Sequence, residues 1–146
     1  MDSKITFKEI AHKSPEWDQA VELRLKLLRI PLGLGFTQED LDNEASEIHY
    51  SGFVDGKTVA TAILKKVNDE DVKMRQVCVD DSCQGKGYGS ELVKVLETAA
   101  KERGYKKMVV HARKTALKFY ERLGYQIEGD EFTEVTVPHY KVVKAL

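Results

Sequence analysis

Residues 77–90 have the sequence VCVDDSCQGKGYGS, and this stretch decides the fold. Its first part, up to Val79, alternates in the manner of a strand, and three glycines then precede a run with helical spacing. Glycine lets backbone N–H groups approach a ligand without hindrance from a Cβ atom. The first N–H groups of a helix have no partner within it and lie at the positive end of its dipole. The stretch therefore predicts a strand–turn–helix unit that can bind an anion such as a pyrophosphate.

The two best-known nucleotide loops do not match this turn. Lys86 could add a positive charge, but it is followed by glycine and not by serine or threonine, so the turn is not a P-loop. A dinucleotide fingerprint needs three spaced glycines in the first strand–helix unit, whereas this turn lies past the middle of the chain. The start of a helix that binds nothing would also explain the glycines, so the turn alone leaves the function open.

Sequence patterns on either side extend this unit into an alternating order of strands and helices. Ser14-Pro15 is a typical helix start, and Thr37 with Asp40 resembles the capping box of another helix. Asp55-Gly56 between two apolar runs predicts a hairpin. The predicted elements are strand 5–9, helix 16–29, a short helix after 37, strands 48–54, 58–67 and 72–79, helix 87–103, strand 107–111, helix 114–123 and two strands within 125–143. The order strand–helix–helix–strand–strand–strand–helix–strand–helix–strand–strand predicts a mixed α/β layer fold.

Length and composition predict one domain over 1–146. The 146 residues are 42% hydrophobic and 32% charged, which is enough for a core of its own. The 23 Lys and Arg against 24 Asp and Glu give a formal net charge of -1, which argues against nonspecific nucleic-acid binding. The first residues, MDSKITFKEI, lack the pattern of a signal peptide, and no apolar run approaches the length of a membrane helix. We therefore expect a cytoplasmic protein without nucleic-acid or membrane partners.

The two cysteines do not indicate a disulfide framework or a metal site. Cys78 and Cys83 lack the C-x-x-C spacing, and no His/Cys cluster accompanies them. Cys78 belongs to an apolar alternating strand and is a predicted core residue, whereas Cys83 precedes the glycine turn. No metal is expected.

A second block changes the interpretation of the glycine turn. Residues 111–125, HARKTALKFYERLGY, together with the turn resemble the GNAT superfamily of acetyl-CoA-dependent N-acetyltransferases. The phosphate-binding pattern of that family is Arg or Gln, two residues, Gly, one residue, then Gly or Ala, and Gln84, Gly87 and Gly89 match it. The later helix of the family carries Ala, then Phe/Leu-Tyr, then Gly-Phe or Gly-Tyr, which the second block matches at Ala116, Phe119-Tyr120 and Gly124-Tyr125. The spacing and element order fit over nearly the whole chain.

The resemblance implies a fold and a cosubstrate. The GNAT fold has a mixed, mostly antiparallel sheet, here of about seven strands with about four helices, whose central strands splay apart to admit the pantetheine arm of acetyl-CoA. The backbone of 77–79 would pair with that arm like an added strand, and the amides of 84–90 would hold the pyrophosphate. The implied acetyl-CoA-binding residues are Val77, Cys78, Val79, Gln84, Gly85, Lys86, Gly87, Tyr88, Gly89, Ser90, Arg113 and Phe119.

The family acetylates an amine by direct attack on the thioester, which requires a neutral amine and favours a proton for the departing thiolate. Tyr120 stands where the family places its acid, and we expect it to be catalytic. Residue type alone favours a packing role for Tyr120, and the match to the family motif reverses that preference. The base stays open between a water chain and six side chains near the expected cleft, namely Glu47, His49, Asp80, His111, Glu134 and His139.

The sequence departs from the family at two positions. Arg113 stands where many members have an Asn that contacts the pantetheine, so it could instead reach a phosphate. Gln84 replaces the commoner Arg and offers no charge. The ending with Phe132, Glu134 and Val137-Pro138-His139, as well as Arg24, Pro31-Leu32-Gly33 and His49, is similar to a bacterial GNAT subgroup of mostly unassigned substrate.

The acceptor cannot be deduced beyond a small amine or a lysine-like side chain. Acidic residues between 39 and 44 could attract a cationic amine, although charges at a helix start are usually only solvated. A non-catalytic acyl-CoA sensor and the use of another acyl donor are the alternatives. The resemblance also allows a homodimer.

Overall fold

The structure is a computed structural model that describes residues 4–146. Within this range the chain forms four α-helices and eight strands in the expected alternating order. The elements are β1 (Thr6–Ile10), α1 (Pro15–Arg24), α2 (Gln38–Asp42), β2 (Ile48–Val54), β3 (Lys57–Lys66), β4 (Asp71–Val79), α3 (Tyr88–Glu102), β5 (Lys107–Arg113), α4 (Leu117–Arg122), β6 (Gln126–Ile127), β7 (Phe132–Glu134) and β8 (Val137–Ala145).

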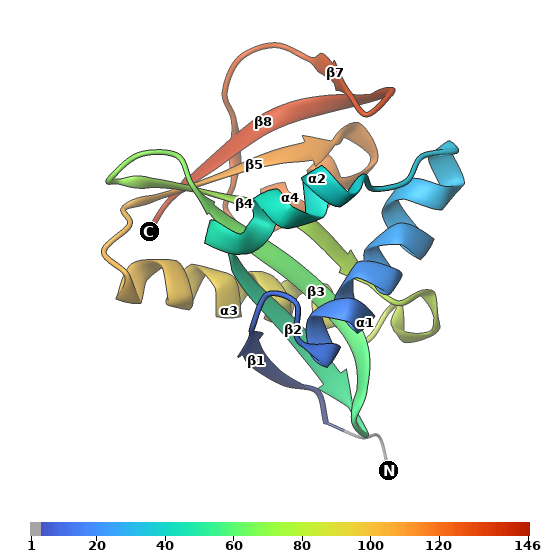
Figure 1. Cartoon of the computed structure of the whole chain (residues 1–146). Helices are drawn as coiled ribbons and strands as arrows, with labels where there is room; N and C mark the ends of the chain where they lie inside the picture. The colour runs from blue at the N-terminus through green and yellow to red at the C-terminus, as the bar shows by residue number, and fades with distance from the viewer. Residues whose placement is uncertain (1–3) are drawn as a thin grey trace.

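All eight strands belong to one sheet (Figure 1). Its order is β1-β2-β3-β4-β5-β8-β6, with β7 also paired to β8. Of the pairs between described strands, only β4 with β5 is parallel. The mixed, mostly antiparallel α/β sheet is therefore confirmed, and the tail holds three strands where the sequence predicts two. The additional strand, β6, has two residues, too few to show an alternating pattern.

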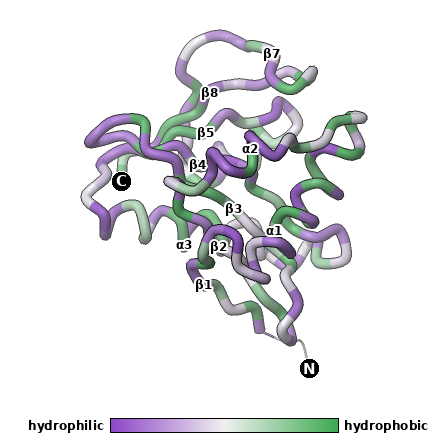
Figure 2. The backbone as a smooth tube through the Cα atoms, viewed as in Figure 1, coloured by the Kyte–Doolittle hydropathy of each residue, from purple (hydrophilic) through white to green (hydrophobic). Residues whose placement is uncertain are grey.

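Local signals account for the elements that the sequence predicts well. Asp55 and Gly56 both have positive φ, 51° and 78°, which is the backbone conformation that a tight two-residue hairpin requires. The side chain of Thr37 accepts from the N–H of Asp40, and the Asp40 carboxylate accepts from the N–H of Thr37, so the capping box is present. The resulting α2 is short and mostly hydrophilic (Figure 2).

Helices cover both faces of the sheet (Figure 1). The larger hydrophobic cluster packs α3 and α4 against the sheet through residues such as Leu92, Leu96 and Tyr120. The smaller cluster packs α1 against the other face through Trp17, Ala20 and Val21, which bears out the prediction of a core position for Trp17. Two-sided burial explains why residues 58–64 of the strand β3 are all buried instead of alternating.

The first helix does not continue regularly to Arg29 as the spacing predicts. The α-helix ends at Arg24, a π-helical turn follows over Leu25–Arg29, and a 3-10 turn over Ile30–Leu32 completes the segment. The N–H of Ile30 donates to the carbonyl of Leu25, five residues back. π-Turns of this kind occur frequently at functional sites. Here the irregular end brings Leu28 and Arg29 into the wall of a cavity.

The strands β4 and β5 pair over only part of their length. Their register runs from Asp71 with Lys107 to Met74 with Val110, whereas both strands continue beyond these residues. A bulge in β4 follows directly, where Gln76 has a φ of 55° and the register with β3 shifts. The two central strands are therefore separated at their carboxyl ends, as the resemblance to the GNAT fold implies.

Candidate active site

A cavity of about 360 Å³ lies at the point where β4 and β5 separate. Gln76 and Val77 of β4 form one wall, and Ala112 and Arg113 of β5 form the opposite wall. The cavity is further lined by Tyr120 from α4 and by side chains from the end of the first helical segment and from β7 and β8. Because parallel pairing has ended here, backbone groups of β4 that face β5 are available to a ligand.

Residues 77–79 have a ladder partner on only one edge among the described strands. Val79 pairs with Ala60 and Cys78 with Thr61 of β3, on the other edge of β4. Toward β5, the register of β4 ends at Met74. A pantetheine arm has amide groups that can pair with an extended backbone, and this edge offers one.

Tyr120 is buried at 5% exposure, yet it lines the cavity. Burial, with a smaller contribution from Cys78, raises the pKa of the Tyr120 phenol above its usual value. The hydroxyl therefore keeps its proton at neutral pH. Burial likewise raises the pKa of the Cys78 thiol to about 12, so Cys78 is a core residue as expected and is not a thiolate nucleophile.

The glycine turn adopts the geometry of an anion cradle. Gly85 and Gly87 have φ values of 80° and 78°, and a Cβ atom at either would meet nothing within 4 Å, so the turn faces open space. Gly87 precedes α3 and no side chain caps this helix, which leaves the N–H groups of Gly89 and Ser90 for an outside acceptor. The exposed Lys86 lies within the same turn.

Three more of the residues expected to bind acetyl-CoA are Phe119, Gln84 and Arg113, and each contacts another part of the chain. A Cβ atom at Gly89 would stand 3.4 Å from the Phe119 ring, which places α4 against the start of α3. Gln84 Nε2 donates to the carbonyl of Val79 at 3.2 Å and thereby closes the turn. Arg113 lines the cavity, but its Nη2 donates to the carbonyl of Leu28 at 2.9 Å. This contact ties β5 to the π-helical turn.

The structure brings together three of the six candidate bases. The Nδ1 of His111 donates to Glu134 Oε1 at 3.1 Å, and His139 Nε2 lies 3.7 Å from Glu134 Oε2. All three side chains line the cavity, because β8 pairs with β5 on one side and with β7 on the other. Burial by itself would raise the pKa of Glu134. The hydrogen bond from His111 and the nearby Lys73 and His139 together outweigh burial, so the pKa of Glu134 is lowered.

The other three candidate bases are engaged elsewhere. His49 is buried and donates through Nε2 to the carbonyl of Glu44 at 3.0 Å, and its pKa is lowered mainly by burial. Glu47 pairs with Arg75 at 2.7 Å. Asp80 accepts from the N–H and Oγ of Ser82, and these hydrogen bonds lower its pKa. None of these three lines the cavity at the strand separation.

Three basic residues of the cavity are not recognised from the sequence. Arg29, Lys73 and Arg75 all line it. The alternation in β4 is the signal that points to two of them, because Lys73 and Arg75 lie on the opposite face from the buried Val72 and Met74. Within residues 4–146, no cluster of His, Cys, Asp and Glu is arranged to hold a metal ion. In the same range, no helix has the length and apolar character needed to span a membrane.

Comparison with known proteins gives a consistent result. The model of the Acetyltransferase (GNAT) family matches residues 15–125. The Bacillus subtilis protein YjcF, named an uncharacterized N-acetyltransferase, is 28% identical over 108 residues, which are 73% of this chain and 77% of that protein. An acyl-CoA N-acyltransferase from Pseudomonas aeruginosa has a TM-score of 0.83 at 17% identity, over 97% of this chain and 100% of that one. A GNAT family acetyltransferase from Elizabethkingia anophelis with acetyl-CoA bound has a TM-score of 0.75 at 20% identity, over 97% and 98%. These structures share the fold.

Proposed function

The chain belongs to the GNAT family of acetyltransferases, and from this premise we propose that it transfers an acetyl group from acetyl-CoA to a primary amine within a ternary complex. One observation carries the proposal. The cavity that contains Tyr120 opens where β4 and β5 separate, at the end of β4 that leads into the glycine turn. The thioester arm of acetyl-CoA and its pyrophosphate would therefore bind to neighbouring residues of one continuous stretch of chain.

In the proposed complex, acetyl-CoA is bound mainly by backbone groups and by only one charged side chain. The edge of 77–79 pairs with the pantetheine, and the N–H groups of 85–90 hold the pyrophosphate, with Lys86 as the charged side chain. Phe119 packs beneath the start of α3 and shapes this surface. Because these groups are local, a net charge of -1 does not oppose binding of an anionic cosubstrate.

Tyr120 and His111 are the proposed proton donor and acceptor. Since His111 donates its Nδ1 proton to Glu134, the Nε2 of the neutral ring is free to accept a proton. The amine nitrogen forms a bond to the acyl carbon and the carbon–sulfur bond breaks. The nitrogen loses a proton to His111, directly or through water, and Tyr120 stabilises the departing thiolate by donating from its hydroxyl.

The function is tested by measuring thiol release from acetyl-CoA over a panel of primary amines. We expect release that depends on both the amine and acetyl-CoA, together with formation of the N-acetyl product. Tight CoA binding without thiol release from any amine would instead identify a non-catalytic acyl-CoA sensor. Propionyl-CoA and succinyl-CoA in the same assay define the acyl preference.

Replacing His111 by asparagine is expected to lower kcat by about 100-fold, the lower end of the range for general-base catalysis, since water in the open cavity can still remove the proton. Added imidazole should restore part of the lost turnover, because it can take up the proton in the open cavity. Acetyl-CoA affinity and the melting temperature should stay unchanged, because His111 is only partly buried. A variant with the kcat of the wild type would exclude His111 as the base.

A further inference from the structure

We propose that the acceptor amine carries an anionic group, a carboxylate or a phosphate, and that Arg29 and Lys73 bind it. The inference rests on the proposed acetyl transfer and names the class of acceptor. It begins from a second cavity of about 340 Å³, to which Arg29, Lys73 and Arg75 also contribute. The three basic side chains thus stand in the wall common to both cavities. An acceptor can place its amine toward Tyr120 and its other end in the second cavity.

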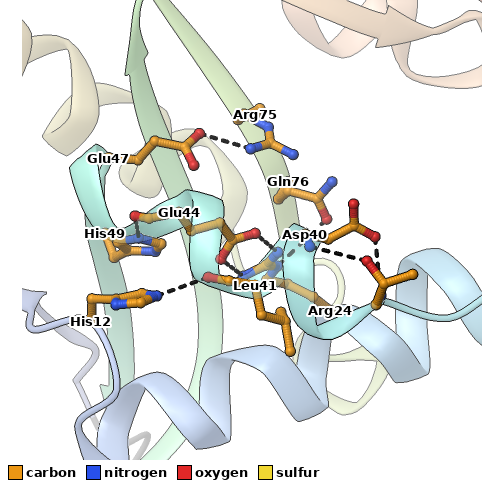
Figure 3. A network of polar contacts seen from close by, with 10 residues as sticks. His12, Arg24, Asp40, Leu41, Glu44, Glu47, His49, Arg75 and Gln76 are labelled. Atoms are coloured by element: carbon orange, nitrogen blue, oxygen red, sulfur yellow. Dashed lines mark hydrogen bonds and ion pairs between the residues drawn. The ribbon is translucent and has the colours of Figure 1, made fainter.

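Neighbouring charges around this wall are paired, whereas Arg29 and Lys73 are not. Arg24 forms a two-fold ion pair with Glu44, and Arg75 pairs with Glu47 at 2.7 Å (Figure 3). Among residues 4–146, no carboxylate oxygen lies within 4.0 Å of a charged nitrogen of Arg29 or Lys73. The guanidinium of Arg29 is held over the ring of Phe36, 4.7 Å from its centroid. Two positioned cations therefore remain without an anion.

The acidic residues near the cavities are already engaged. The Asp40 carboxylate accepts from the N–H of Thr37 at 3.0 Å, and it acts on Arg29 only at longer range. Glu134 accepts from His111. Asp40 thus belongs to a helix cap, and Glu44 belongs to a buried ion pair. The carboxylate of Glu44 is therefore not available to attract a cationic amine.

The electrostatic environment of both cations favours an added anion. Burial lowers the pKa of Arg29, and the nearby guanidinium groups of Arg24, Arg75 and Arg113 act in the same direction against Asp40. Burial also lowers the pKa of Lys73, with Arg75 acting in the same direction and Glu134 opposing it. A carboxylate or phosphate bound between Arg29 and Lys73 would relieve this repulsion. A second ammonium group in the acceptor would add to it.

This site is separate from the proposed pyrophosphate cradle. Lys73 precedes Val79 by six positions along β4, which corresponds to about 20 Å at the rise of a strand. The glycine turn lies beyond Val79, so an anion at Arg29 and Lys73 belongs to the acceptor and not to the phosphates of acetyl-CoA.

The test compares acceptors with and without an anionic group. The pairs are 4-aminobutyrate with 4-aminobutanamide and 5-aminopentanoate with 5-aminopentanamide, and 2-aminoethyl phosphate with ethanolamine supplies the phosphate arm. We measure kcat/KM with acetyl-CoA and, separately, the Kd of each compound for the CoA-saturated protein, in which no transfer can occur. We expect the anionic member of a pair to be favoured by about 10- to 100-fold in both measurements. The better of the carboxylate and phosphate arms identifies the anion.

Variants of the chain separate this site from general effects. Arg29→Gln and Lys73→Gln should each remove most of the preference for the anionic member and leave the Kd of acetyl-CoA unchanged. Neither should lower the melting temperature by more than a few degrees, because neither cation forms an ion pair and Arg29→Gln loses only the contact with the Phe36 ring. Lys106→Gln makes the same change of charge at an exposed ion pair with Glu70, away from both cavities, and should retain the preference.

The two proposals fail in different ways. Equal or better turnover and binding of the neutral members would overturn the anionic acceptor and leave acetyl transfer intact. Charge-dependent binding that is lost in Arg29→Gln, without thiol release from any amine, would support the anion site and overturn acetyl transfer. Absence of any charge preference in the binding measurement would overturn the anion site whether or not the enzyme turns over.

Discussion

Replacing Glu44 by alanine is expected to lower the free energy of unfolding by about 3–5 kcal/mol, the cost of leaving a buried charge without its partner. Arg24 is 0% exposed and Glu44 is 2% exposed, so water cannot replace the lost carboxylate. Both guanidinium Nη atoms of Arg24 donate to Glu44, one of them at 2.9 Å (Figure 3). Urea denaturation measured at equilibrium gives the change.

Two comparisons identify the cause of this loss. Glu47→Ala breaks an ion pair whose arginine is 26% exposed, and we expect a cost of about 1 kcal/mol or less. The double variant Arg24→Met with Glu44→Leu removes both charges and should be more stable than Glu44→Ala alone. A loss for Glu44→Ala no greater than that for Glu47→Ala would contradict the assignment of a buried, structurally essential pair.

Replacing Tyr120 by phenylalanine is expected to lower kcat by about 1000-fold, within the range for loss of a positioned acid. The ring remains, so its edge-to-face contacts with Phe119 and Tyr125 and the packing of α4 should persist. The Kd of acetyl-CoA should therefore stay at the wild-type value. Steady-state kinetics with the best amine, together with equilibrium binding of acetyl-CoA, measures both quantities.

Tyr125→Phe is the matched control for that experiment. Tyr125 is also buried, but its hydroxyl donates to Glu97 at 2.8 Å, and it does not line the cavity. Loss of this hydrogen bond should cost about 1–3 kcal/mol of stability and leave kcat nearly unchanged. If Tyr120→Phe retained wild-type kcat, the phenol would be a packing residue, as its residue type alone also allows.

Local sequence signals predicted much of the fold. Hairpin residues with positive φ, the capping box at Thr37 and the glycine turn before α3 are decided by a few neighbouring residues, and each occurs where the sequence predicts it. The π-helical turn and the bulge at Gln76 were missed. The two irregularities meet in the fold, where Arg24 Nε donates to Gln76 Oε1 at 3.5 Å across 52 residues of chain, and such a long-range contact leaves no local pattern in the sequence.

The same difference between local signals and long-range contacts applies to the candidate site. The glycine turn and the Phe119-Tyr120 pair were recognised because they are contiguous motifs. The choice among six candidate bases required the pairing of β5, β7 and β8, which brings Glu134 to His111. The unpaired cations at Arg29 and Lys73 could not be predicted, because whether a charge has a partner is decided by which carboxylates the fold places beside it.

The short parallel register between β4 and β5 is the connection between two parts of the sheet. It joins two antiparallel half-sheets, β1–β4 and β5–β8, through the residues from Asp71 with Lys107 to Met74 with Val110. The glycine turn follows the first half-sheet, and Tyr120 belongs to the second. The contact of Phe119 with the start of α3 also crosses from one half to the other, so packing as well as the short ladder fixes the glycine turn relative to Tyr120. Substitutions at Phe119, which does not line the cavity, are therefore expected to shift the turn relative to Tyr120.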